Sequence, residues 1–169
     1  MRILHVENGR HLYGGALQVF YLLQGLSEKS DCSNYLVCPR LSDIQNCSHE
    51  YADRIYSLPI KGDLDFAFFL RLLRIIKRVR PDIVHVHSRR GADIWGGLAG
   101  RLAGVKTVLS RRVDNPESKI VVKPKYSLFD KVIVISHKIG EILISEGVAK
   151  DRVVCVPSAV DCQKYQSPC

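Results

Sequence analysis

No stretch of this sequence is both apolar enough and long enough to cross a membrane. The most apolar segment, residues 66–79, is interrupted by four basic side chains: Arg71, Arg74, Lys77 and Arg78. A membrane-spanning helix needs about 18 or more residues with almost no charge. The first ten residues, MRILHVENGR, also lack the apolar core of a secretory signal peptide. We therefore expect a cytoplasmic protein.

Familiar cofactor motifs are missing as well. The six cysteines, at positions 32, 38, 47, 155, 162 and 169, include no C-x-x-C pair, and no His/Cys spacing is typical of a zinc site. Because disulfide frameworks belong mainly to smaller secreted chains, we expect reduced cysteines. Gly9 and Gly14 do not have the spacing of G-x-G-x-x-G, which disfavours a nicotinamide-dependent dehydrogenase. The sequence therefore predicts neither a metal nor another cofactor.

The composition is that of a single globular domain with a basic surface. The chain has 169 residues, of which 46% are hydrophobic and 25% charged, and its net charge is +8. A basic surface favours phosphate-bearing partners, such as nucleotide sugars, anionic lipid headgroups or nucleic acid. Nucleic acid is disfavoured among these, because the sequence contains no recognised nucleic-acid-reading motif.

Short β-branched runs alternate with longer helical patterns along the chain. This alternation predicts an α/β fold, a Rossmann-like doubly wound parallel sheet of about seven strands with helices on both faces. The expected strands are residues 3–6, 35–38, 55–58, 83–86, 107–109, 132–135 and 153–156, and the expected helices are 15–28, 64–80, 91–103 and 138–146. Residues 112–125 mix charges and prolines and are expected to form a loop. The expected domain is 1–157, and 158–169 would begin a linker to further protein.

Polar clusters follow several strands, where open α/β sheets bind ligands. Gly14 and Gly15 precede a helix, so free backbone N–H groups there could meet an anion, although a structural turn explains them too. His85 and His87 lie two apart on one strand and therefore share a face. His87 lies nearer the strand end and is the better candidate for a ligand contact; a metal would need a third ligand that the sequence does not place.

Further candidates follow the neighbouring strands. Ser88 and Arg89 come directly after His87. Ser110 and Arg111 end the fifth strand, and arginine suits bidentate phosphate or carboxylate contacts, although a solvated loop would look the same. Ser136 could border the same cleft or simply cap a helix.

The segment 66–80 forms an amphipathic helical pattern with its basic side chains along one side. Such a helix could lie on an anionic membrane surface, which would make the protein peripheral at the inner face of the membrane. Equally, it could cover a sheet and leave its basic face in water, which is the alternative that we favour.

In order and spacing, the motifs resemble the N-terminal domain of GT-B-fold glycosyltransferases of family four. The matching pieces are residues 1–6, Gly14-Gly15, 80–87, 104–108, 130–136 and 151–157. Two positions depart from the pattern. Ser110-Arg111 stands where many members have a histidine near the transferred sugar, and Pro157-Ser158-Ala159-Val160-Asp161 replaces the usual Pro-Asn-Gly linker.

The resemblance implies the N-terminal half of a retaining enzyme with no tightly held metal. In that family this half mainly binds the acceptor, here a sugar or lipid-linked molecule, and a C-terminal domain absent from this sequence mainly binds the nucleotide-sugar donor. Gly14 and Gly15 would lie near the donor phosphates, with Arg111 on the same side of the cleft. His87, Ser88, Arg89, Ser110 and Ser136 would lie on the acceptor side. A role in cell-envelope glycan or lipopolysaccharide synthesis is the expectation for the whole enzyme. The alternatives are a non-catalytic anion- or membrane-binding module and a GT-B nucleotide-sugar epimerase.

Overall fold

The computed structural model describes residues 1–62, 64–87, 91–115 and 117–162. Seven strands form one sheet in the order β3-β2-β1-β4-β5-β6-β7, and all neighbouring pairs are parallel. Their bounds are β1 Arg2–Val6, β2 Ser33–Pro39, β3 Arg54–Leu58, β4 Ile83–Val86, β5 Lys106–Arg111, β6 Lys131–Val134 and β7 Val153–Cys155. This confirms the predicted fold class, and all seven predicted strands are present.

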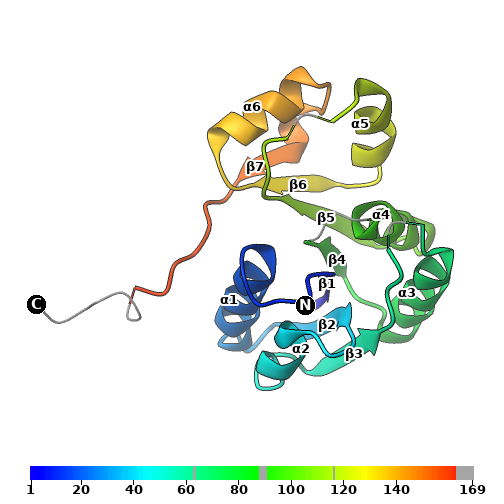
Figure 1. Cartoon of the computed structure of the whole chain (residues 1–169), viewed down its shortest axis with the longest axis vertical. Helices are drawn as coiled ribbons and strands as arrows, with labels where there is room; N and C mark the ends of the chain where they lie inside the picture. Colours follow the sequence, from blue (N-terminus) through cyan, green and yellow to red (C-terminus); the bar gives the residue numbers. More distant parts are fainter. Residues whose placement is uncertain (63, 88–90, 116, 163–169) are drawn as a thin grey trace, which may run out of the picture.

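Helices cover both faces of the sheet. They are α1 Gly15–Ser27, α2 Asp43–Cys47, α3 Phe66–Val79, α4 Ala92–Leu102, α5 Lys119–Tyr126 and α6 His137–Ser145. The larger core packs α3 to α6 against one face, with Leu4, Val84 and Val132 from the strands. The smaller core packs α1 and α2 against the other face. Figure 1 shows α1 and the pair α3 and α4 on opposite sides of the sheet.

The glycines of α4 let this helix approach the sheet closely. A Cβ built on Gly96 would lie 2.6 Å from Val86 Cγ2, and one on Gly97 would lie 2.8 Å from the Phe129 ring. Real Cβ atoms do not come this close to their neighbours, because protein interiors are tightly packed. The small residues of this segment therefore serve helix–sheet packing.

The prediction of a loop over residues 112–125 is wrong in its second half, where α5 spans Lys119–Tyr126. The local sequence does not indicate this helix, because Pro124 lies inside it and its apolar residues show little helical periodicity. Tertiary contacts hold it instead: Val122 and Tyr126 are buried in the larger core. Lys125 also forms ion pairs with Asp93 and Glu117.

The amphipathic helix α3 covers the sheet, which is the alternative that we favoured. Its apolar side is buried, including Phe68, Leu72 and Ile76. Asp65 caps its N-terminus by accepting a hydrogen bond from the Phe68 N–H at 2.9 Å. Because most of the apolar side packs against the sheet, the basic side chains form most of the exposed surface of α3, together with Phe66 and Leu70.

After β7 the chain leaves the sheet and returns past α1 (Figure 1). The Gln18 side chain joins the two segments, because its amide bonds both the N–H and the C=O of Ala159 at 2.7 Å. Within the residues that the structure describes, no helix is both long and apolar enough to cross a membrane.

Candidate functional site: a polar cleft at the carboxyl edge of the sheet

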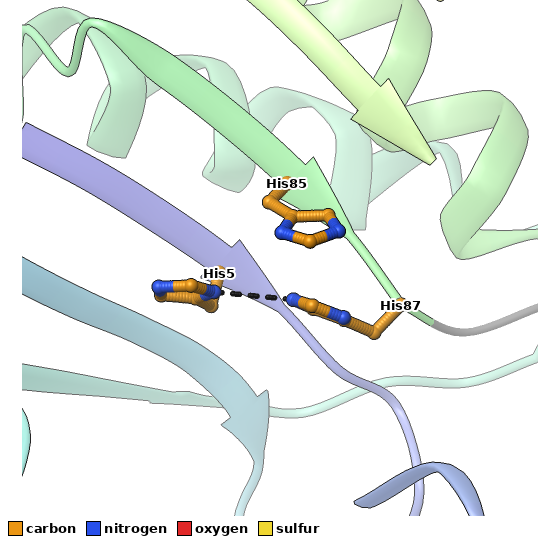
Figure 2. Close-up of side chains that lie close together, drawn as sticks. All are labelled: His5, His85 and His87. Carbon is orange, nitrogen blue, oxygen red and sulfur yellow. Dashed lines mark hydrogen bonds between the residues drawn. The ribbon is translucent and has the colours of Figure 1, made fainter. Parts of the chain in front are cut away.

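Three histidines meet near the carboxyl ends of the two central strands. His5 of β1 and His85 of β4 are direct register partners, and His87 follows β4 on the same face. His5 Nδ1 and His87 Nε2 are 3.1 Å apart and share a hydrogen bond (Figure 2). The His85 and His87 rings are 3.8 Å apart between centroids. We call these three residues the histidine cluster.

The outer nitrogens of two of these rings have protein partners. His85 Nε2 lies 2.9 Å from Ser110 Oγ. His5 Nε2 lies 3.4 Å from Asn34 Oδ1, so the His5 N–H points at the amide oxygen. His87 Nδ1 is buried and has no hydrogen-bond partner among the described residues. Two of the rings are therefore fixed in orientation, and the third keeps one nitrogen uncommitted.

Burial keeps the histidine cluster neutral. It lowers the pKa of His5 to about 4, against which the hydrogen bond to Asn34 acts only weakly. Burial also lowers the pKa of His85 and His87 well below the ordinary value, and the charges of neighbouring histidines and Arg112 lower it further. At neutral pH these rings therefore carry lone pairs rather than positive charge.

A cleft of about 670 Å³ opens beside the histidine cluster. The loop after β1 forms one wall, and His87, Ser110 and Arg112 contribute from the neighbouring strand ends. A second hollow of about 310 Å³ lies between α1 and β4 to β6, with His85 in its wall. Ser110 and Arg112 line both hollows, so the histidine cluster lies where they meet.

The loop after β1 is shaped by Glu7 and two glycines. Glu7 is buried, and its Oε1 accepts a hydrogen bond from the Gly9 N–H at 2.6 Å. Gly14 has φ +52° and ψ −115°, which a residue with a Cβ adopts only under strain. Gly15 begins α1 and lines the cleft, so the free N–H groups at this helix start lie at its wall. This arrangement suits an anionic group.

Two arginines line the cleft, the exposed Arg10 and the partly buried Arg112. Burial lowers the pKa of Arg112, whereas the nearby Glu7 carboxylate raises it. Its Nε is buried without a hydrogen-bond partner in the described part of the chain. A guanidinium with a free donor beside a helix start is well placed to bind a phosphate or a carboxylate.

The prediction that Arg111 lines the cleft is wrong. Side chains alternate across a strand, so Arg111 lies on the face opposite to Ser110 and Arg112. It is 3% exposed and forms an ion pair with Glu117 at 2.8 Å. It also donates to the Tyr126 hydroxyl at 2.6 Å. With the Glu117–Lys125 and Asp93–Lys125 ion pairs, these contacts form a closed set that we call the Arg111 network.

A family model described as Glycosyltransferase Family 4 matches residues 13–164, which is nearly the whole chain. The chain belongs to this family. No curated protein sequence matches it significantly.

Solved structures share the fold of this family-4 domain. The Anabaena HepE protein in complex with UDP and glucose has a TM-score of 0.76 at 12% identity, covering 99% of this chain and 47% of that one. A glycosyltransferase from Rickettsia africae has a TM-score of 0.71 at 18% identity, covering 98% and 45%. The UDP-GlcNAc 2-epimerase of Neisseria meningitidis, bound to UDP-GlcNAc, has a TM-score of 0.71 at 14% identity, covering 92% and 45%. The chain thus spans about half the length of these proteins.

The other predicted site residues of the family-4 domain fall in different places. Gly15, His87 and Ser110 line the cleft. Gly14 shapes the turn before Gly15 but is not in the cleft wall, and Ser136 caps α6 by accepting from the Ile139 N–H at 3.4 Å. Ser88 and Arg89 lie outside the described residues.

Of the residues at this site, only His5 lay outside the candidate clusters of the sequence. Glu7 and Arg112 stood within the clusters 7–15 and 110–112, but neither was given a role of its own. Strand alternation could have selected Arg112, because it lies two residues after Ser110, as His87 lies two after His85. His5 is the third imidazole that the sequence did not place. It is a single histidine within an apolar run, and only the pairing of β1 with β4 puts it beside His85.

Proposed function

We propose that this chain is the N-terminal, acceptor-side half of a retaining glycosyltransferase that uses a nucleotide-sugar donor and acts in cell-envelope glycan or lipopolysaccharide synthesis. The observation that carries the proposal is the polar cleft of a family-4 domain, with Gly15 and Arg112 in one wall and His87 in another. We place the reaction in the cytoplasm, at the inner face of the membrane when the acceptor is lipid-linked.

The Gly15 and Arg112 side of the cleft has the chemistry of an anion site. In sugar transfer from a nucleotide sugar, negative charge develops on the diphosphate as it leaves. Preorganised N–H donors and a guanidinium stabilise such charge, because they need no reorganisation during the reaction. The donor's nucleotide would be held mainly by a second domain, and this side of the cleft would contact its phosphates.

The His87 and Ser110 side would receive the acceptor. A neutral imidazole can accept a hydrogen bond from a sugar hydroxyl, which a protonated ring cannot do. Because burial lowers the pKa of His87, the ring keeps this acceptor capacity at neutral pH. His87 would therefore orient the attacking hydroxyl.

A nucleotide-sugar epimerase is the second candidate. Its support is the similarity in fold to the UDP-GlcNAc 2-epimerase of Neisseria meningitidis. An epimerase would need no acceptor, so product analysis separates the two candidates.

Binding to the isolated chain tests the anion side of the cleft. UDP, UDP-glucose and UDP-GlcNAc should each shift amide NMR signals around Gly15, with weak affinity. Arg112→Gln should lose this binding by about 10–100-fold, since a charge-assisted contact contributes about 1.5–3 kcal/mol. Arg101→Gln, an exposed change on α4, is the matched control. Equal binding by both variants would contradict the proposal.

Turnover tests the division of labour between the halves. The isolated chain should show no sustained sugar transfer, because positioning donor and acceptor together contributes roughly 7–11 kcal/mol to catalysis. Joined to the part of the Rickettsia africae glycosyltransferase that this chain does not cover, it should transfer sugar with retention at the anomeric carbon. Multiple turnovers by the chain alone would refute the proposal. Conversion of UDP-GlcNAc without any acceptor would favour the epimerase.

A further inference from the structure

We propose that His5, His85 and His87 form a binding site for one zinc-like transition-metal ion, with an open coordination position facing the cleft. Their ligand nitrogens all lie within 4.8 Å of one another. All three rings come from the same face of two adjacent strands, as Figure 2 shows. The sequence placed no third ligand, and the family resemblance implied no tightly held metal; His5 supplies the third imidazole.

The spacing of the nitrogens suits a shared metal ion. His5 Nδ1 and His87 Nε2 are 3.1 Å apart. Two imidazole nitrogens that bind one tetrahedral Zn²⁺ at about 2.0–2.1 Å are separated by roughly 3.3 Å. The separation of these two nitrogens is therefore already close to that of a metal pair, but each ring must turn so that its lone pair points at the ion instead of at the other nitrogen. His85 Nδ1 is the remaining nitrogen of the third ring, because His85 Nε2 is committed to Ser110. The His85 ring lies 3.8 Å from the His87 ring between centroids, so it would have to turn to aim Nδ1 at the same ion and complete a three-histidine site.

The partners of the outer nitrogens are those of metal-binding histidines. Such a histidine almost always donates its other N–H to a protein oxygen, which fixes the tautomer and the ring orientation. His85 Nε2 pairs with Ser110 Oγ, and His5 Nε2 pairs with Asn34 Oδ1. In the tautomers whose outer nitrogens carry the proton, the inward nitrogens are lone-pair donors.

Metal binding would also replace the hydrogen bond between His5 and His87, and its proton would need a new position. With the His5 proton on Nε2, the His87 proton lies on Nε2 and points at His5 Nδ1. When the metal takes both inward nitrogens, this proton moves to His87 Nδ1, which is buried and has no partner in the described residues. In the metal-bound state His87 therefore cannot accept a hydrogen bond from an acceptor hydroxyl, and that role belongs to the metal-free state. The rings stay neutral, so no net proton is released.

The chemistry of the donors selects the ion. Neutral imidazoles suit Zn²⁺, Cu²⁺, Ni²⁺ and Co²⁺, whereas Mg²⁺ and Ca²⁺ prefer oxygen ligands. Arg112 opposes a cation nearby, but the Glu7 carboxylate interacts with Arg112 and offsets its charge. The ion can enter through the cleft, because His87 lines its wall. Its fourth position would hold water or a ligand oxygen.

Metal titration of the purified chain tests the proposal. After chelator treatment, the wild-type chain should bind one Co²⁺, with the visible spectrum of a tetrahedral site, and Zn²⁺ should displace it. His87→Gln should weaken binding by at least about 100-fold, and Ser110→Ala by about 10-fold, as is typical when a group that orients a ligand is lost. His49→Gln and His137→Gln, both at exposed positions, are the matched controls and should bind normally.

Two readouts keep the test decisive. The exposed cysteines could bind metal, and they would show a thiolate-to-cobalt charge-transfer band. X-ray absorption on the zinc-loaded wild type counts imidazole ligands without any mutation, so a misfolded variant does not block the test. Three imidazoles support the site. Cysteine ligation, or equal affinity in wild type and His87→Gln, overturns it. UDP binding is measured separately and tests the glycosyltransferase proposal alone.

Discussion

Two buried polar clusters lie at the same edge of the sheet, and they differ in how completely they are satisfied. The Arg111 network joins opposite charges, and Arg111 alone contacts Glu117, Tyr126 and the carbonyls of Val113 and Asn115. The histidine cluster contains only neutral rings and borders a cleft. Arg111, in the first cluster, and Arg112, which lines the cleft beside the second, are adjacent residues on opposite faces of β5 and its extension.

This difference indicates that the Arg111 network stabilises the fold, whereas the histidine cluster can contact a ligand. In the Arg111 network the side chains bond to one another, and these bonds fix α5 against the larger core. The histidine cluster and Arg112 keep buried nitrogens without partners among the described residues. Uncommitted buried polar atoms cost free energy, so they are more often retained where a ligand completes them.

Removing Arg111 should have the largest effect on stability. Arg111→Met should lower the free energy of unfolding by about 3–5 kcal/mol, because it leaves buried Glu117 with fewer partners. Arg112→Met should cost less than about 1 kcal/mol, because its guanidinium is less committed. Urea denaturation measures both. Similar losses in the two variants would erase the contrast between the clusters.

The second largest effect on stability should come from protonation of the histidine cluster at acidic pH. The pKa of His5 is lowered from 6.5 to about 4 by burial, and the His85 and His87 rings lie beside it. The charge of Arg112 acts on His85 and His87. The unfolded chain therefore binds more protons between these values, and the free energy of unfolding should fall with decreasing pH. Between pH 6.5 and pH 4, His5 alone should lower the free energy of unfolding by up to about 1.4 kcal/mol for each pH unit.

Denaturation of the metal-free protein from pH 7 to pH 4 measures this dependence. His5→Asn should flatten the curve, whereas exposed His137→Gln should not change it. A slope identical in wild type and His5→Asn would show that the cluster is not protonated on unfolding in the way we expect.

The two glycines before α1 should separate turn geometry from ligand approach. Gly14→Ala should destabilise the fold by about 1–2 kcal/mol, because Gly14 has positive φ. A Cβ at Gly15 would meet Arg112 Cδ and Glu7 Oε2 at an ordinary 3.8 Å, so Gly15→Ala should keep the stability. Gly15→Val should nevertheless impair UDP binding, since its branches extend into the cleft. Thermal melts and NMR titration measure the two effects, and the reverse pattern would contradict this assignment.

The basic side of α3 should give the smallest effect, because it belongs to neither cluster. Arg74, Lys77 and Arg78 are exposed, whereas the apolar side of the helix is buried. Any binding to anionic vesicles should therefore be electrostatic, worth about 1 kcal/mol per basic residue, and should disappear at high salt. Co-sedimentation with anionic and neutral vesicles checks this. Salt-insensitive binding would mean that α3 inserts, which its packing opposes.

Much of the fold could be predicted because its signals are local. Apolar runs at residues 3–6, 83–86, 132–135 and 153–156 are typical of strands buried on both faces, and all four are strands here. The helix α5 could not be predicted in this way, since ion pairs and core contacts hold it against a weak local pattern. Of the predicted site residues, His87, Gly15 and Ser110 line the cleft, whereas Arg111 is buried on the other face of the strand.

The sequence by itself determined the alternation of strands and helices, the polar residues at strand ends and the membership of Glycosyltransferase Family 4. Only the tertiary structure decided which of those polar residues meet. Strand order and register bring His5 beside His85 across 80 residues of chain. The pleat of β5 sends Arg111 to the core and Arg112 to the cleft. Periodicity depends on residues that are close in sequence, but register depends on hydrogen bonds between strands that are distant in sequence.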